Sequence, residues 1–133
     1  MSELYIGTDL VDIDRIYLSI EKYQTKFLDR VFSIKEQEYC KSKSKPSIHF
    51  AGRFAAKEAV IKSIKSSGYT QPIELNSISI INNPDGSPFV VLDLSFKGTV
   101  KVSISHTETH AIAFALAELN HKWGLLQKAN QKI

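Results

Sequence analysis

Two carboxylates and a lysine occupy positions where a charge needs a chemical explanation. Asp9 lies near the end of an apolar run, and Glu58 lies in an alanine-rich segment with Lys62 four residues later. A carboxylate in apolar surroundings must be hydrated, hydrogen-bonded or bound to a cation. Residues four apart on a helix point to the same side. One interpretation is therefore a metal site made by Asp9 and Glu58, with the Lys62 ammonium nearby.

Each of these residues also has a simpler interpretation. Asp9 alone is typical of a turn or helix-cap aspartate. Glu58 and Lys62 match an exposed ion pair on one helix, worth only about 0.3–0.5 kcal/mol. Such a pair does not explain why residues 53–62 place their charges among small and apolar residues, since an exposed helix normally carries more polar ones.

Histidine and cysteine provide two further candidates. His106 follows an alternating apolar strand, so a hydrogen bond at the strand end and contact with an anion both fit it. His106 and His110 have the spacing of a helical zinc pair, but the flanking pattern is strand–turn–strand and the HExxH motif is absent. Cys40 is the only cysteine. It cannot form an internal disulfide, which agrees with a reducing compartment, and we expect it to pack at a helix end.

Length and composition predict one soluble domain over residues 1–133, with the tail after about residue 119 left without a role. Hydrophobic residues make up 43% of the chain and charged residues 23%. No apolar run approaches the roughly 20 residues that a membrane span needs. The charges before Arg15 are all acidic, unlike those of a secretory signal, so we expect a cytoplasmic protein without membrane contact. The formal net charge of +3 favours anionic partners but does not choose among phosphorylated cofactors, nucleic acids and acidic proteins.

The first half of the chain predicts a strand followed by several helices. Residues 4–11 form the strand, and Asp12 can cap a helix whose apolar residues follow at helical spacing. A short helix is expected at 27–31. Another follows Ser33, because Glu36 three residues later completes a capping box.

One long helix, at about residues 47–66, carries Glu58 and Lys62. Ser47 is its expected cap, and Gly68 is its expected stop. Alanines recur along one side of this helix, at positions 51, 55 and 59. Small side chains there allow a neighbouring element to approach closely.

The second half predicts strands at 76–81, 89–96, 100–105 and 110–119, separated by turn-forming residues. Together these elements indicate an α+β fold with an N-terminal strand, several helices and then an antiparallel β-meander. The sequence has no dinucleotide fingerprint, no P-loop and no nucleophile elbow. It also lacks the aromatic signature of an RNA-recognition motif.

Four blocks of the sequence resemble, in order, the holo-acyl-carrier-protein synthase family of phosphopantetheinyl transferases. Residues 6–16 resemble the family's GxD strand and following helix, and residues 30–36 resemble its RxFTxxE segment. The most specific block is RFAAKEAVIK at 53–62. The last block is SISHT at 103–107 with AIA at 111–113. The sequence departs from the family at Ser87, where the family has the lysine of a GKP turn, and at 64–68, where it keeps one glycine.

The resemblance implies a magnesium-dependent transferase that moves the 4′-phosphopantetheine arm of coenzyme A to a serine of apo acyl carrier protein. Adenosine 3′,5′-bisphosphate would leave, and the reaction would support fatty acid biosynthesis. Asp9 and Glu58 would bind Mg²⁺, while Lys62 would stabilise charge on the pyrophosphate. The base that accepts the serine proton would be Glu58 or a metal-bound water, and the sequence does not separate the two.

The resemblance also implies binding roles outside the carboxylate pair. Arg53 and His106 would contact the phosphates of coenzyme A, and Arg15 would meet the acidic carrier protein. Family members of this short type form homotrimers with active sites at subunit interfaces, so a homotrimer is expected here. No nucleic-acid partner is expected.

Two other functions compete with the transferase. A non-catalytic binder of nucleotides or RNA would explain the positive charge but not the carboxylate at Glu58, and its affinity would fall steeply with salt. A magnesium-dependent pyrophosphate hydrolase could use the same carboxylates and lysine. It would release free phosphopantetheine instead of adding that group to a protein.

Overall fold

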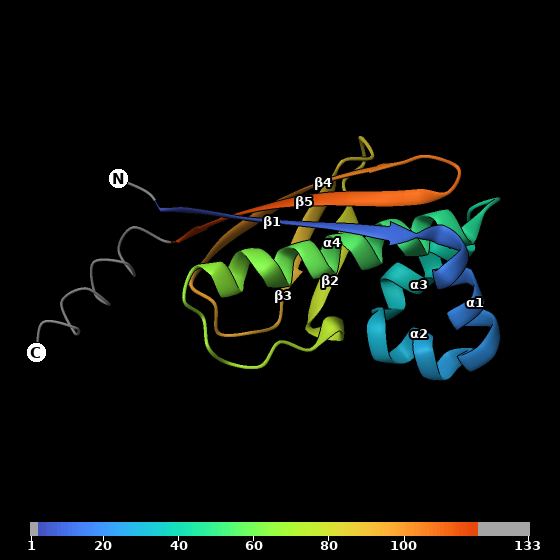
Figure 1. Cartoon of the computed structure of the whole chain (residues 1–133), viewed down its shortest axis with the longest axis horizontal. Helices are drawn as coiled ribbons and strands as arrows, with labels where there is room; N and C mark the ends of the chain where they lie inside the picture. The colour runs from blue at the N-terminus through green and yellow to red at the C-terminus, as the bar shows by residue number, and fades with distance from the viewer. Residues whose placement is uncertain (1–2, 120–133) are drawn as a thin grey trace, which may run out of the picture.

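The computed structural model describes residues 3–119 and confirms the α+β class. Figure 1 shows the long helix α4 lying along one face of a sheet, with the shorter helices α1–α3 gathered near the end of β1. Among the described residues, no helix is both long and apolar enough to cross a bilayer. The elements are β1 (Leu4–Asp12), α1 (Ile13–Tyr23), α2 (Thr25–Val31), α3 (Ile34–Lys41), α4 (Pro46–Ser66), the 3₁₀ turn η1 (Leu75–Ser77), β2 (Ile78–Asn82), β3 (Pro88–Leu92), β4 (Gly98–His106) and β5 (His110–Leu119).

The strands divide between two antiparallel sheets. One sheet has the order β1-β5-β4, and the other contains only β2 and β3. The C-terminal strands therefore form two hairpins instead of one continuous meander, and β1 joins the second hairpin by pairing with β5. This pairing places Asp9 opposite Ala113, in the middle of β5.

Local capping signals behave as the sequence predicts, with one exception. The Asp12 side chain accepts a hydrogen bond from the backbone of α1, and Ser33 and Glu36 form the capping box of α3. Gly68 follows α4 with a φ of +95°, a left-handed conformation that suits glycine. The prediction that Ser47 caps α4 is wrong, because the helix begins at Pro46 and its N-cap is Lys45. Proline fits the first helical position, where its missing N–H has no partner to lose.

Small residues let α4 and the sheet approach closely. Ala51, Ala55 and Ala59 of α4 are fully buried, as are the inward-facing alanines of β5. Gly7 of β1 lies directly against α4. A Cβ atom at Gly7 would come within 2.2 Å of the Ala59 carbonyl oxygen and 2.7 Å of the Ser63 backbone nitrogen. The close approach matters for function because Asp9 lies two residues further along the same face of β1.

We expect Gly7→Ala to lower the free energy of unfolding by about 1–3 kcal/mol, because the new methyl group meets backbone atoms that cannot rotate away. Urea unfolding followed by circular dichroism measures this change. Gly52→Ala is the matched control, since the nearest atom to its Cβ is a methyl carbon of Ile104 at 3.1 Å. Equal stability of the two variants would contradict close packing at Gly7.

Candidate functional site

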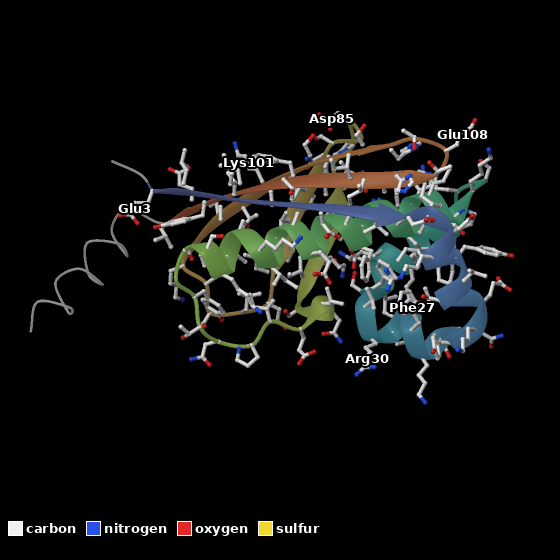
Figure 2. All side chains as sticks on the ribbon, viewed as in Figure 1. Glu3, Phe27, Arg30, Asp85, Lys101 and Glu108 are labelled. Atoms are coloured by element: carbon white, nitrogen blue, oxygen red, sulfur yellow. The ribbon has the colours of Figure 1, made fainter. Side chains whose placement is uncertain are left out.

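Asp9 and Glu58 open into the same cavity of about 350 Å³, at the place where β1 meets α1, α2 and α4. The alternation of β1 turns Gly7, Asp9 and Val11 toward α4, and Glu58 lies on the helix face that receives them. The Asp9 side chain keeps about one fifth of its surface exposed. The rest of the lining mixes polar residues such as Asp12 with apolar ones, which include Phe54 and Phe27; Figure 2 labels Phe27 on α2.

The two carboxylates influence each other. Burial raises the pKa of Glu58, and the negative charge of Asp9 raises it further. The charges of Lys62 and Lys65 act in the opposite direction. A pair of like charges in a partly closed cavity is unfavourable by itself, and a nearby cation relieves it.

Lys62 contacts Asp9 and not the carboxylate one turn away on its own helix. Its Nζ lies 3.2 Å from Asp9 Oδ1 and donates to the Thr8 carbonyl oxygen at 2.9 Å. The simple ion pair between Glu58 and Lys62 is thus not the arrangement found among the described residues. Lys62 is about half exposed, so its ammonium also faces the solvent from which a ligand would arrive.

The donor atoms suit a hard divalent cation. Asp9 and Glu58 offer carboxylate oxygens, which Mg²⁺ prefers, and Mg²⁺ is commonly held by one or two carboxylates together with substrate phosphates and water. Within residues 3–119 no cluster of three or more histidine, cysteine, aspartate or glutamate side chains could hold a metal. The residues present therefore fit a Mg²⁺ ion that takes its other ligands from a phosphorylated substrate. Their role in metal binding stays a prediction.

Arg15 lies at the rim of the same cavity, on the exposed side of α1. The Asp12 cap starts α1 at Ile13, so Arg15 falls in the first turn, and Ser19 lies one turn further along the cavity wall. Leu18, three residues after Arg15 on α1, is an exposed apolar residue on the same side of the helix. The arrangement offers a cation at the edge of the cavity and an apolar contact next to it.

Arg53 belongs to a second cluster, near the N-terminal half of α4. Its side chain is almost fully buried, and its guanidinium carbon lies 4.0 Å from the centre of the Tyr39 ring. An Nη2 atom donates to Asn82 Oδ1 at the end of β2. The Nε atom has no hydrogen-bond partner among the described residues. Tyr39 and Asn82 thus hold a buried guanidinium whose Nε–H group is left without a hydrogen bond among the described residues.

A lysine and a histidine also contact the Tyr39 ring on which Arg53 lies. The Lys43 Nζ atom lies 4.6 Å from the centre of the Tyr39 ring, and the His49 ring meets the same tyrosine edge-on at 5.9 Å. Burial lowers the pKa of His49, as do the charges of Arg53, Lys43 and His106. The fold therefore brings Arg53 and His106 toward the same histidine, and the cluster attracts anions. Sequence reasoning missed Lys43 and His49, although His49 precedes Arg53 by one helical turn.

The structure gives neither a zinc pair of histidines nor a reactive cysteine at the positions considered. His106 ends β4 and His110 begins β5, so the two are not on a helix and have no zinc geometry. The His106 Nδ1 atom lies 3.1 Å from the Thr107 carbonyl oxygen, while the exposed imidazole leaves its other nitrogen for a ligand. Cys40 is fully buried, and burial raises its pKa to about 12, which excludes a reactive thiolate at neutral pH.

Comparison with known proteins finds similar sequences and similar folds. Residues 5–115 match the family model of the 4′-phosphopantetheinyl transferase superfamily. A holo-[acyl-carrier-protein] synthase from Protochlamydia amoebophila is 42% identical over 118 residues, which cover 85% of this chain and 96% of that protein. The fold resembles the ACPS-CoA complex from Chronobacterium ammoniagenes, with a TM-score of 0.78, 25% identity and coverage of 90% of this chain and 99% of that one. It also resembles the Helicobacter pylori holo-[acyl-carrier-protein] synthase in complex with coenzyme A, with a TM-score of 0.71, 32% identity and coverage of 84% and 98%.

Proposed function

Because the chain belongs to the 4′-phosphopantetheinyl transferase superfamily, as a transferase of the holo-[acyl-carrier-protein] synthase type, we propose that it transfers phosphopantetheine from coenzyme A to a serine of apo acyl carrier protein. The proposed reaction requires Mg²⁺ and serves fatty acid biosynthesis in the cytoplasm. The observation that carries the proposal is that Asp9 and Glu58 line one cavity and Lys62 contacts Asp9, on a fold that holds coenzyme A in the relatives.

The proposed reaction is a substitution at phosphorus. The carrier serine oxygen forms a bond to the β-phosphorus of coenzyme A, and the bond from that phosphorus to the bridging oxygen breaks. Adenosine 3′,5′-bisphosphate leaves with the bridging oxygen, and the serine proton passes to a base. Such a reaction depends mainly on positioning and on stabilising negative charge.

Asp9 and Glu58 would hold the Mg²⁺ ion between β1 and α4. A bound Mg²⁺ would neutralise charge on the pyrophosphate oxygens. Lys62 extends from the same helix face as Glu58, so its ammonium would stabilise the charge that develops on the leaving phosphate. Glu58 also lines the cavity on which the carrier serine would approach, so it would be the base or the group that orients it.

The cation cluster around Tyr39 would bind the other phosphate groups of coenzyme A. Arg53 and His106 would contact these phosphates, and Lys43 adds to the positive charge nearby, while the lowered pKa of His49 favours its neutral form. Arg15 would meet the acidic carrier protein at the rim of the cavity, next to the exposed Leu18 side chain. This arrangement would place the carrier serine on the open side of the carboxylates.

The outer face of the larger sheet supports the proposal of a homotrimer. β5 turns alanines toward α4 and larger apolar residues outward, with Ile112 and Phe114 each more than 40% exposed. The neighbouring strand adds Ile6 and Leu10, and Leu10 pairs directly with Ile112. Large apolar side chains side by side on an exposed face are typical of an interaction surface. The copy number of three comes from the family resemblance.

We expect Phe114→Lys to separate the subunits, because a lysine at the centre of this apolar face would be buried without a partner. Native mass spectrometry of the wild type would show three copies, and the variant would show one. Transfer activity would fall with the loss of interfacial sites. Ile34→Lys is the matched control, since Ile34 is exposed on α3. A monomeric wild type at assay concentration would contradict the trimer.

The experiment that tests the function combines the protein, coenzyme A, Mg²⁺ and an apo acyl carrier protein. The intact mass of the carrier should increase by one phosphopantetheine group, and chelation of the metal should prevent the increase. An unchanged carrier with free phosphopantetheine in solution would instead indicate the hydrolase. Tight, salt-sensitive RNA binding without any transfer would indicate the nucleic-acid binder.

A further inference from the structure

A buried ion pair links α4 and α3, the two helices that carry Arg53 and Tyr39. The Lys57 Nζ atom lies 2.6 Å from Glu36 Oε1, and both side chains are fully buried. Lys57 Nζ also donates to the carbonyl oxygens of Val31 at 2.7 Å and Ile78 at 2.6 Å. We call these two residues and their hydrogen bonds the Lys57–Glu36 clamp. The clamp connects α4 with α3, with the end of α2 and with β2.

Along the edge of β2 that faces away from β3, the clamp makes the backbone hydrogen bonds that a neighbouring strand would otherwise make. The Asp93 N–H bonds to the Ser77 carbonyl at the start of the hairpin, so the alternation of an antiparallel pair turns the backbone groups of Ile78 and Ile80 away from β3. Lys57 donates to the Ile78 carbonyl, and Glu36 Oε2 accepts from the Ile80 N–H at 3.0 Å. The donor and acceptor come from side chains, so β2 has a fixed position along α4.

A buried ion pair is an expensive way to hold a fold together. Removal of two charges from water costs several kcal/mol per ion, and well-packed apolar residues of similar volume are often as stable or more stable. A methionine at position 57 could fill the same buried space without the cost of removing a charged group from water. An ion pair with directional hydrogen bonds is favoured over an apolar contact where the neighbouring elements must be held in fixed positions.

Both supports of the Arg53 guanidinium are attached to this clamp. Tyr39, whose ring stacks on Arg53, lies on α3 one turn after Glu36. Asn82, which accepts from Arg53, lies two residues after Ile80 on β2. Arg53 itself precedes Lys57 by one turn of α4. A shift of β2 or α3 relative to α4 would therefore move the tyrosine, the asparagine or both away from the guanidinium.

We propose that the Lys57–Glu36 clamp positions Arg53 for a phosphate group of coenzyme A, with Lys57 and Glu36 acting as positioning residues that never touch the substrate. The inference rests on the proposed function, because it takes Arg53 to be a coenzyme contact. It assigns the buried lysine next to Glu58 a role in substrate affinity, while Glu58 and Lys62 serve the reacting phosphate.

The test measures steady-state transfer with the full chain, Mg²⁺ and apo carrier, over a range of coenzyme A concentrations. We expect the double variant Lys57→Met with Glu36→Gln to raise the KM for coenzyme A about tenfold and to change kcat less than about twofold, because uniform binding is lost. Glutamine keeps one acceptor oxygen, which can serve the Ile80 N–H group, whereas its NH2 group cannot accept from the Ser33 N–H group. Asn82→Ala should produce a similar rise.

A double-mutant cycle with Arg53→Ala separates positioning from general stability. Arg53→Ala should raise the KM by itself, and the clamp variant should add nothing in that background, because coupled residues are not additive. Gln37→Leu is the matched control. Gln37 is also a buried polar residue of α3, bonded to Asp29 and the Phe32 carbonyl, and its loss should lower the melting temperature without a change in KM.

Each outcome decides the proposal. A clamp variant with an unchanged KM, or with a KM effect that adds fully to that of Arg53→Ala, overturns it and leaves the clamp a purely structural feature. If the double variant does not fold, Glu36→Gln alone and Asn82→Ala decide by the same KM criterion. An unchanged KM in Arg53→Ala overturns the role of Arg53 in binding, and the positioning role with it. A carrier that gains no mass with the wild-type protein instead overturns the proposed function.

Discussion

Glu58→Gln should lower kcat/KM for phosphopantetheine transfer by about 10²–10⁴, the range typical of a lost general base. Glutamine has the size of glutamate but is a weaker metal ligand and cannot accept a proton. The intact mass of the carrier protein reports the remaining activity. The affinity for Mn²⁺, measured by electron paramagnetic resonance as a substitute for Mg²⁺, should fall as well. Asp9→Asn should produce both losses, since it removes the other carboxylate.

The same Glu58→Gln variant should be more stable than the wild type at neutral pH in the absence of divalent ions. The pKa of Glu58 is raised by burial and by the charge of Asp9, so the folded state binds a proton more tightly than the unfolded state. The stability linked to this group is present below the ordinary glutamate pKa and is lost as the pH rises through the raised value. The variant should therefore melt at a higher temperature at pH 7.5, and the difference should vanish in acid.

A control variant makes the result specific to the site. Glu38→Gln removes an exposed carboxylate of α3 that does not line the cavity, so activity and Mn²⁺ affinity should not change. Nearly normal turnover in Glu58→Gln would exclude this residue from the reaction. A melting temperature equal to that of the wild type at pH 7.5 would exclude the electrostatic strain between the two carboxylates.

Lys62→Met should lower kcat by about 10²–10³, the cost typical of one donor that stabilises charge in a transition state. Its effect on metal binding should have the opposite sign to that of Glu58→Gln. The Lys62 ammonium lies 3.2 Å from Asp9, so it competes with a divalent cation for that carboxylate. Two unit charges 4 Å apart interact by about 1 kcal/mol in water, so loss of the lysine should tighten Mn²⁺ binding by about fivefold.

A variant with slower turnover but tighter metal binding would distinguish a role of Lys62 at the site from a purely structural role. Lys35→Met is the control, because it removes the same charge from an exposed position on α3. Weaker Mn²⁺ binding in Lys62→Met would show that the lysine organises the carboxylates instead of competing for them. Unchanged turnover would exclude Lys62 from the reaction.

The fold and part of the site could be predicted because their signals are local. A capping box needs only Ser33 and Glu36, which are three residues apart. A strand is recognised by the alternation of apolar and polar residues along a few positions. The sequence between 53 and 62 likewise identified Glu58 and Lys62 as unusual charges. The prediction that Ser47 caps α4 was wrong even though it is local, because Pro46 is already compatible with the first turn.

Other features of the site had no local signal. Lys57 and Lys62 lie on the same helix in similar sequence surroundings, yet one is fully buried and the other is half exposed. The stacking of Arg53 on Tyr39 and its bond to Asn82 join three elements. The pairing of β1 with β5 and the separation of β2 and β3 into a second sheet likewise join segments far apart in the sequence, which the hairpins alone do not predict.

By itself, the sequence determined which segments become helices and strands, and which charged residues are out of place on a soluble surface. Backbone propensity and capping act within a few residues, so this information survives without any tertiary contact. The tertiary structure decided which charges meet. It pairs Lys62 with Asp9, buries Lys57 with Glu36 and places His49 close enough to Arg53 and Lys43 for their charges to lower its pKa. Those pairings depend on how β1, α3 and β2 pack against α4, and close packing of small residues such as Gly7 sets those distances.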